Sequence, residues 1–157
     1  MPSTKEIEKQ YNELRKKLRL PDFKELDNGF EISDLEETNF LLRAVVRRIA
    51  EKLDFYTTML EEVLQPDTSN LYAMHETSYL DEDEKKKMYN LYGKLMNLNR
   101  RSIEVSLGHN QINEAEFINE VLSEWKNLRV ELLKYVRKMK DSWKTEADTK
   151  EDIGYLG

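Results

Sequence analysis

One long amphipathic stretch, residues 33–65, limits what this chain can fold into. Ser33 and Glu36 have the spacing of a capping box, and Pro66 ends the pattern because proline has no N–H to donate and clashes with the preceding turn. Between them, large apolar residues recur at steps of three and four: Leu35, Leu42, Val45 or Val46, Ile49, Leu53, Tyr56, Leu60 and Val63. The spacing predicts one long helix whose apolar face must pack against other helices of similar length.

The same periodicity predicts three further helices, over residues 4–19, from Asp81 to about Leu107, and from Asn113 to Trp143. Asp81 and Glu84 repeat the capping-box spacing, and Asn113 is the expected cap of the last helix. Gly93 lies inside a helix, where glycine costs about 1 kcal/mol relative to alanine, so we expect a close helix crossing there. Trp125 lies in the middle of the apolar stripe of the last helix and is predicted to be buried.

Two connectors join these helices. Residues 20–32 contain the turn signal Asp27-Asn28-Gly29, and their apolar residues predict a segment that packs across the end of a bundle. These apolar residues are Phe23, Leu26, Phe30 and Ile32. Residues 66–80 leave two alternatives open, a loop or a short helix capped by Asp67 or Thr68, and they gather two tyrosines, a methionine and a histidine.

The predicted fold is therefore all-α: an antiparallel helical bundle of three long helices plus a shorter N-terminal helix. Residues 1–144 are predicted to form a single helical-bundle domain. Residues 145–157 have four acids, one base and no periodicity, so we expect a flexible acidic C-terminal tail.

Composition excludes several functions. Charged residues make up 36% of the chain, above the average of about 25%, as the outer faces of long helices require. The absence of cysteine removes disulfides, thiolate nucleophiles, iron–sulfur clusters and cysteine zinc sites. No secretory signal and no run of about 18 apolar residues is present, so we expect a cytoplasmic protein that does not span a membrane. The net charge of −6 argues against nucleic acid as the main partner.

The function that the sequence favours is that of a non-catalytic intracellular interaction or assembly protein, self-association included. The first helix carries a narrow apolar stripe that needs a partner surface: Ile7, Tyr11, Leu14 and Leu18. If it packs on the long helix, beside Phe40, Leu41, Phe55 and Met59, the domain is closed and monomeric. If residues 20–32 hold it away, the stripe is free to form a homodimer, which is the geometry we expect.

The alternative function is binding of a small anionic ligand or a nucleic-acid phosphate through an arginine cluster on the second and third helices. Its candidate residues are Arg43, Arg47, Arg48, Arg100 and Arg101. No catalytic constellation is visible, so we expect neither an enzyme nor a cofactor. No paired metal-ligand spacing exists either, which leaves His75 and Glu76 as the only weak candidates for a metal site.

Several short motifs resemble those of uncharacterised all-helical proteins of archaea, over most of the chain. They are Leu20-Pro21-Asp22-Phe23, Glu25-Leu26-Asp27, Phe30-Glu31-Ile32-Ser33, Asn99-Arg100-Arg101-Ser102-Ile103-Glu104, Ala115-Glu116-Phe117-Ile118 and Trp125. The resemblance implies an all-helical fold and no particular activity.

Overall fold

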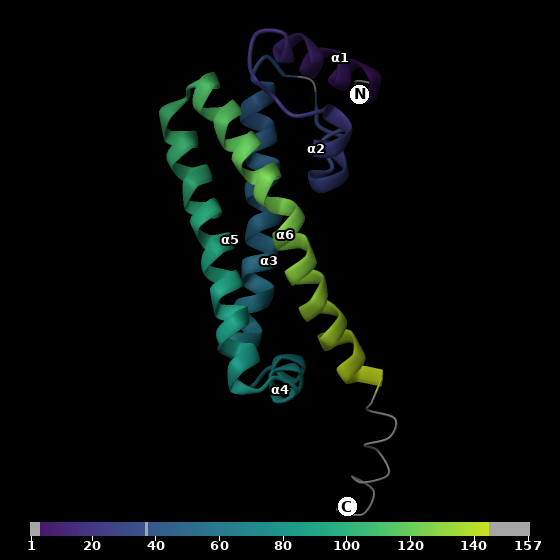
Figure 1. Cartoon of the computed structure of the whole chain (residues 1–157), viewed down its shortest axis with the longest axis vertical. Coiled ribbons are helices and arrows are strands. Elements are labelled where there is room, and N and C mark those ends of the chain that lie inside the picture. Colours follow the sequence, from purple (N-terminus) through teal and green to yellow (C-terminus); the bar gives the residue numbers. More distant parts are fainter. Residues whose placement is uncertain (1–3, 37, 145–157) are drawn as a thin grey trace, which may run out of the picture. The chain divides into compact units, whose positions relative to one another are not determined.

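The computed structural model of the chain describes residues 4–36 and 38–144 (Figure 1). Within these ranges it has six α-helices and no strand, which confirms the all-α class. The helices are α1 (Thr4–Arg15), α2 (Phe23–Phe30), α3 (Leu41–Leu64), α4 (Leu71–Ser78), α5 (Glu82–Gly108) and α6 (Gln111–Lys144). Across this described part, none of the helices combines the length and the apolarity that a bilayer crossing requires. The predicted tail, residues 145–157, lies outside the described residues.

The chain divides into two compact units. Among the described residues, unit 1 comprises 4–36, 38–57 and 94–126, and unit 2 comprises 58–93 and 127–144. Helices α3, α5 and α6 each contribute one segment to each unit. The packing of these helices into one antiparallel bundle, and the single domain over residues 1–144, stay predictions.

In unit 1, the expected connector 20–32 is largely helical, which corrects the turn predicted there. Asp22 caps α2 by accepting a hydrogen bond from the Glu25 N–H. The Asp27-Asn28-Gly29 sequence lies inside this helix, and Glu31 ends it with a left-handed backbone (φ 54°). The segment is helical despite the turn signal because the helix buries an apolar face made of Phe23, Leu26 and Phe30.

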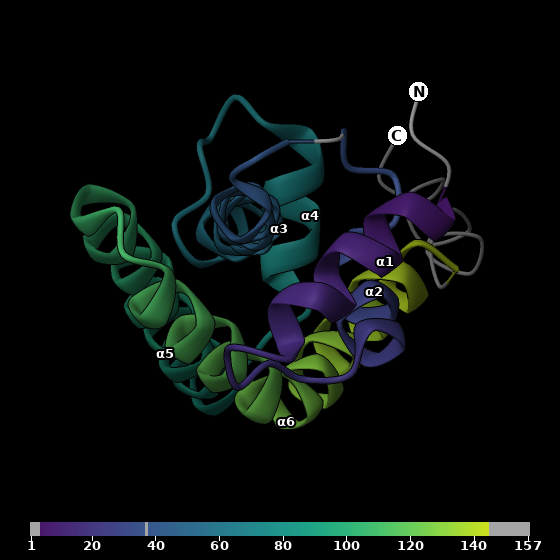
Figure 2. The ribbon, with the colours of Figure 1, turned by 90° about the horizontal axis from the view of Figure 1, so that it is seen from above.

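Helix α1 packs on α2 within the same chain (Figures 1 and 2). Ile7 and Tyr11 are fully buried, the Tyr11 ring lies 5.5 Å from that of Phe23, and its hydroxyl donates to the Pro21 carbonyl oxygen over 2.6 Å. Leu14 and Leu18 are half-buried, and the helix ends at Arg15 rather than at residue 19. Intrachain packing therefore buries Ile7 and Tyr11, two residues of the stripe that was expected to be open, and the homodimer stays a prediction.

Helix α3 begins at Leu41, eight residues after the predicted cap. The Ser33 N–H donates to Asp27 Oδ1 over 2.8 Å, so this residue belongs to the loop that follows α2. The Thr38 hydroxyl accepts from the Phe40 N–H over 3.1 Å, immediately before the helix. The capping box predicted for Ser33 and Glu36 is therefore wrong, because a hydrogen bond to Asp27, six residues earlier, holds Ser33 in the loop and outside the helix.

Trp125 joins three elements of unit 1. Its ring centroid lies 5.0 Å from that of Phe30 on α2 and 5.7 Å from that of Tyr56 on α3. A Cβ added to Gly29 would lie 3.3 Å from its ring, so the glycine lets α2 approach α6. Trp125 is only 7% exposed, which confirms that it is buried.

The ends of α5 and α6 are partly as predicted. The capping box is confirmed: the Glu84 N–H donates to Asp81 Oδ1 over 2.8 Å, and the Asp81 N–H donates to Glu84 Oε1 over 3.3 Å. Asn110, not Asn113, caps α6, because its Oδ1 accepts from two backbone N–H groups of the first turn. The close crossing expected at Gly93 is also wrong, since no described atom lies within 4 Å of a Cβ built there.

Candidate interaction surface

The short helix α4 presents apolar side chains to solvent in unit 2. Asn70 caps it, accepting from the Ala73 N–H over 3.2 Å, so neither Asp67 nor Thr68 is the cap. The buried face contains Ala73, whereas Leu71 is 86% exposed and Met74 is 40% exposed. Leu71 and Met74 are three residues apart and share the outer face of the helix.

Aromatic side chains lie on both sides of this face. The Tyr72 hydroxyl donates to Glu62 Oε2 over 2.7 Å, on the last part of α3, beside which α4 lies (Figure 2). The His75 ring stacks on Trp143 with centroids 3.9 Å apart, and it also lies 5.0 Å from the Tyr79 ring. We call the exposed residues Leu71, Tyr72, Met74, Tyr79 and Trp143 the α4 surface.

Polar contacts fix α4 against the last turn of α6. The His75 Nε2 lies 3.3 Å from the Ser142 carbonyl oxygen, and the Trp143 Nε1 donates to Glu76 Oε2 over 3.0 Å. A helix of eight residues is marginal alone, so these contacts and the burial of Ala73 hold it in place. The α4 surface is therefore apolar and pre-organised.

His75 and Glu76, the two candidates for a metal site, take part in these contacts instead. In residues 4–36 and 38–144, no group of three histidine or acidic side chains is placed to hold a metal ion. The absence of a cofactor stays a prediction.

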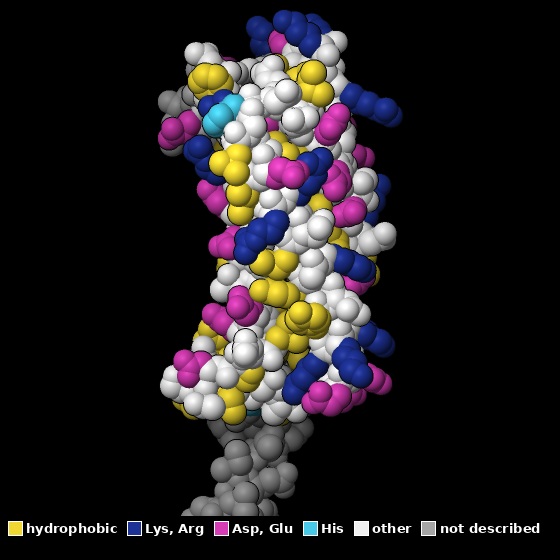
Figure 3. All heavy atoms as spheres, turned by 90° about the vertical axis from the view of Figure 1, so that its left-hand side faces the viewer, with side chains coloured by type: hydrophobic (Ala, Val, Ile, Leu, Met, Phe, Trp, Pro, Cys, Tyr) yellow, Lys and Arg dark blue, Asp and Glu magenta, His cyan; other side chains and the backbone are white. Residues whose placement is uncertain are grey.

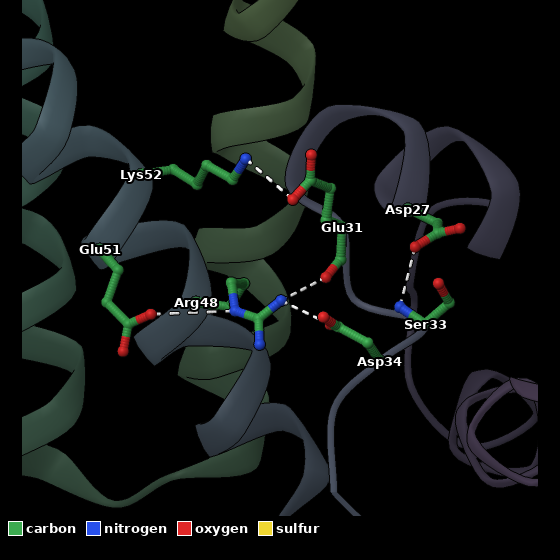
Figure 4. A network of polar contacts seen from close by, with 7 residues as sticks. All are labelled: Asp27, Glu31, Ser33, Asp34, Arg48, Glu51 and Lys52. Atoms are coloured by element: carbon green, nitrogen blue, oxygen red, sulfur yellow. Dashed lines mark hydrogen bonds and ion pairs between the residues drawn. The ribbon is translucent and has the colours of Figure 1, made fainter. Parts of the chain in front are cut away.

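Arg48 belongs to a network in unit 1 that holds the loop after α2 onto α3 (Figure 4). Its Nη1 donates to the Glu31 carbonyl oxygen over 2.5 Å and to Asp34 Oδ1 over 2.7 Å. Its Nε lies 3.8 Å from Glu51 Oε2, and the neighbouring Lys52 Nζ lies 3.2 Å from Glu31 Oε2. Figure 4 shows the Nη1 and Nε atoms of the guanidinium directed at these oxygen atoms, so part of its hydrogen-bonding capacity is used within the chain.

The other candidate arginines of unit 1 have separate surroundings. Arg47 and Arg48 line one surface hollow of about 550 Å³, and its lining includes three acids: Asp34, Glu36 and Glu51. Arg43 lies over the Phe40 ring at 4.6 Å. Arg100 donates to Asn99 Oδ1, while Arg101 lies 2.6 Å from Glu104 and 3.3 Å from Glu120. The structure thus brings Arg47 and Arg48 to one hollow, and Arg43, Arg100 and Arg101 are not in its lining.

Glu114 is a buried acid of unit 1 that sequence reasoning did not single out. It is 4% exposed, in the first turn of α6. Burial raises the pKa of its carboxyl, and the charges of Arg43 and His109 partly oppose that shift. The Arg43 Nε is itself buried with no hydrogen-bond partner among the described residues. Glu114 lies four residues after the capping Asn110. Acids are common in the first turn of a helix, where they are usually exposed to solvent, so nothing in the sequence indicates that this one is buried.

Exposed hydrophobic side chains also occur elsewhere. In unit 1 they include Ile103, Leu107 and Ile112 at the turn between α5 and α6. Figure 3 shows one face on which hydrophobic side chains reach the surface between side chains of Lys, Arg, Asp and Glu. The α4 surface differs because α4, the helix that carries Leu71, Tyr72 and Met74, has no lysine or arginine.

No family model matches this sequence, and the comparisons with curated proteins and with solved structures found no match. The function must therefore be inferred from the geometry.

Proposed function

We propose that this chain is a non-catalytic interaction module and that it binds a protein partner through the α4 surface. One observation carries the proposal: Leu71, the first residue of a fixed helix, is 86% exposed and shares the outer face of that helix with Met74. Single exposed leucines are common and need no explanation. Here, however, a methionine, two tyrosines and a tryptophan accompany it, and these residue types are enriched at protein interfaces.

The pre-organisation of α4 supports the same proposal. Binding requires the ordering of side chains and loops, which reduces affinity when the surface is mobile. Trp143 is held by both its stack on His75 and its hydrogen bond to Glu76, so it is ordered before any partner arrives. Anchors of this kind, partly exposed and rigid, are typical binding hot spots.

The alternative of anion binding has less support. Arg48 and Arg101 are already paired with acids, and the hollow beside Arg47 has three acids in its lining. An anion entering that hollow would meet more negative than positive side chains. No observation therefore favours this site over the α4 surface.

The proposal is tested by comparing two variants in affinity capture from the source cells. Leu71→Ser with Met74→Ser removes the centre of the α4 surface. Leu107→Ser removes an equally exposed leucine (79%) from unit 1 and is the matched control. We expect the wild type and the control to retain a protein that the α4 variant loses, with unchanged far-ultraviolet circular dichroism. Identical sets of captured proteins for all three chains would contradict the proposal.

A further inference from the structure

The segment of the chain that carries α4 is strongly one-sided in charge. Residues 58–84 contain eight acids and no lysine or arginine: Glu61, Glu62, Asp67, Glu76, Asp81, Glu82, Asp83 and Glu84. Two of these acids have cationic partners, since Glu82 pairs with Lys85 and Glu84 pairs with Lys138. The other six form no ion pair in the described part of the chain. On the α6 side of the α4 surface, Lys140 and Lys144 flank Trp143, and both pair with Asp141. Six of the eight acids in residues 58–84 are therefore left without a cationic partner among the described residues.

Two of the unpaired acids adjoin the apolar side chains directly. Glu62 accepts the hydrogen bond of Tyr72, and Glu76 accepts that of Trp143; both hydrogen bonds are exposed to solvent, although each glutamate is half-buried. A carboxylate has about four lone-pair sites, so one hydrogen bond leaves each free to accept further donors. The α4 surface thus combines apolar anchors with carboxylates that can accept from a cation.

From this charge complementarity, we propose that the partner presents a basic amphipathic helix to the α4 surface. This inference rests on the proposed function. Apolar residues of the partner, spaced by three and four, pack against Leu71 and Met74, as two helices pack ridge into groove. Lysine or arginine residues beside that apolar ridge reach Glu62 and Glu76. An acidic partner of the same shape is repelled, so charge sets the specificity.

The probe is a fluorescent synthetic peptide of about 14 leucine and lysine residues, with leucine at helical spacing. Its control carries glutamate in place of every lysine. Binding to the full chain is measured by fluorescence anisotropy. We expect the lysine peptide to bind and the glutamate peptide not to bind. The affinity of the lysine peptide should fall about tenfold for the variant Leu71→Ser with Met74→Ser, and it should not change for Leu107→Ser.

The charge is tested by a second pair of variants. Glu62→Gln with Glu76→Gln removes the two carboxylates of the α4 surface, whereas Glu116→Gln with Glu124→Gln removes two exposed acids of unit 1 and gives the same net charge. We expect only the first pair of substitutions to lower the affinity for the lysine peptide by about tenfold. The same pair should also make that affinity depend less on salt concentration between about 0.05 M and about 0.5 M.

Three results would overturn this inference. The first is equal weakening by both glutamine pairs, which means that net charge alone attracts the peptide. The second is binding of the glutamate peptide as well. The third is a dimer in sedimentation equilibrium that Leu71→Ser with Met74→Ser dissociates, because a second copy would then occupy the surface. If the α4 variant loses a captured protein while the lysine peptide does not bind, the proposed function stands and only the basic partner is wrong.

Discussion

Replacing Trp125 by alanine tests the packing of unit 1 most directly. A tryptophan side chain buries about 150–250 Å². At about 25 cal/mol per Å² this corresponds to about 4–6 kcal/mol, an upper estimate because the unfolded chain already buries some of that area. Trp125 is only 7% exposed and has ring partners on α2 and α3, so its neighbours relax only partly into the space it leaves. We therefore expect Trp125→Ala to lower the free energy of unfolding by about 3–5 kcal/mol.

The assay is urea denaturation followed by far-ultraviolet circular dichroism, with Trp143→Ala as the matched control. Trp143 is the only other tryptophan, and at 43% exposed it should cost less than half as much. The slope of free energy against urea must be the same in both variants for the comparison to measure stability. A loss below about 1 kcal/mol for Trp125→Ala would refute the reasoning, because it would place the ring outside the core.

Three further predictions concern stability. Gly93→Ala should raise the free energy of unfolding by about 1 kcal/mol, because the site is open and helical, whereas Gly29→Ala should give no such gain because its Cβ would press on the Trp125 ring; urea denaturation of both variants compares them. Burial raises the pKa of Glu114, so its contribution to stability is greatest below its unfolded pKa and is lost as pH rises through the folded value; Glu114→Gln should therefore raise the melting temperature at about pH 7, with a gain that shrinks towards about pH 4, and a constant gain would contradict this. Arg48→Met should cost about 1–2 kcal/mol and speed amide hydrogen exchange in residues 31–36, since that loop depends on the guanidinium; unchanged exchange would exclude such a role.

The interiors of the helices could be predicted from the sequence, whereas several of their ends could not. Apolar periodicity located α3, α5 and α6 and the burial of Trp125, because a repeated spacing averages over many residues. A cap depends on a few hydrogen bonds, and another side chain can take the place of any of its partners. Asp27 Oδ1 accepts the hydrogen bond of the Ser33 N–H. The spacing of Ser33 and Glu36 therefore fits a capping box, but no helix begins there.

The same reasoning explains α2. Asp27, Asn28 and Gly29 each favour a turn, and each has a poor helix propensity. Their cost is offset by the burial of Phe23, Leu26 and Phe30, which appears only once α1 and Trp125 are in place. Local propensity could not anticipate this tertiary contribution.

The candidate site was partly visible in the sequence. The unusual tyrosine, methionine and histidine content of residues 66–80 pointed to this segment. Its partner Trp143 lies 67 residues after Glu76, and nothing in either segment indicates that the two side chains meet. The arginines, by contrast, drew attention by type and spacing, and three-dimensional packing gave each a different neighbour.

The absence of lysine and arginine around α4 also determines which reagents can detect a bound partner. No such residue occurs between Lys52 and Lys85, so trypsin releases the whole of α4 in a single fragment, residues 53–85. Cross-linkers that react with amines have no attachment point within that fragment except at Lys85, its last residue. A lysine cross-linker could thus report a contact on Leu71 or Tyr72 only through lysines outside this fragment, such as Lys140 and Lys144 beside Trp143, whereas a reagent that couples carboxyl groups to amines could join Glu62 or Glu76 directly to a lysine of the partner.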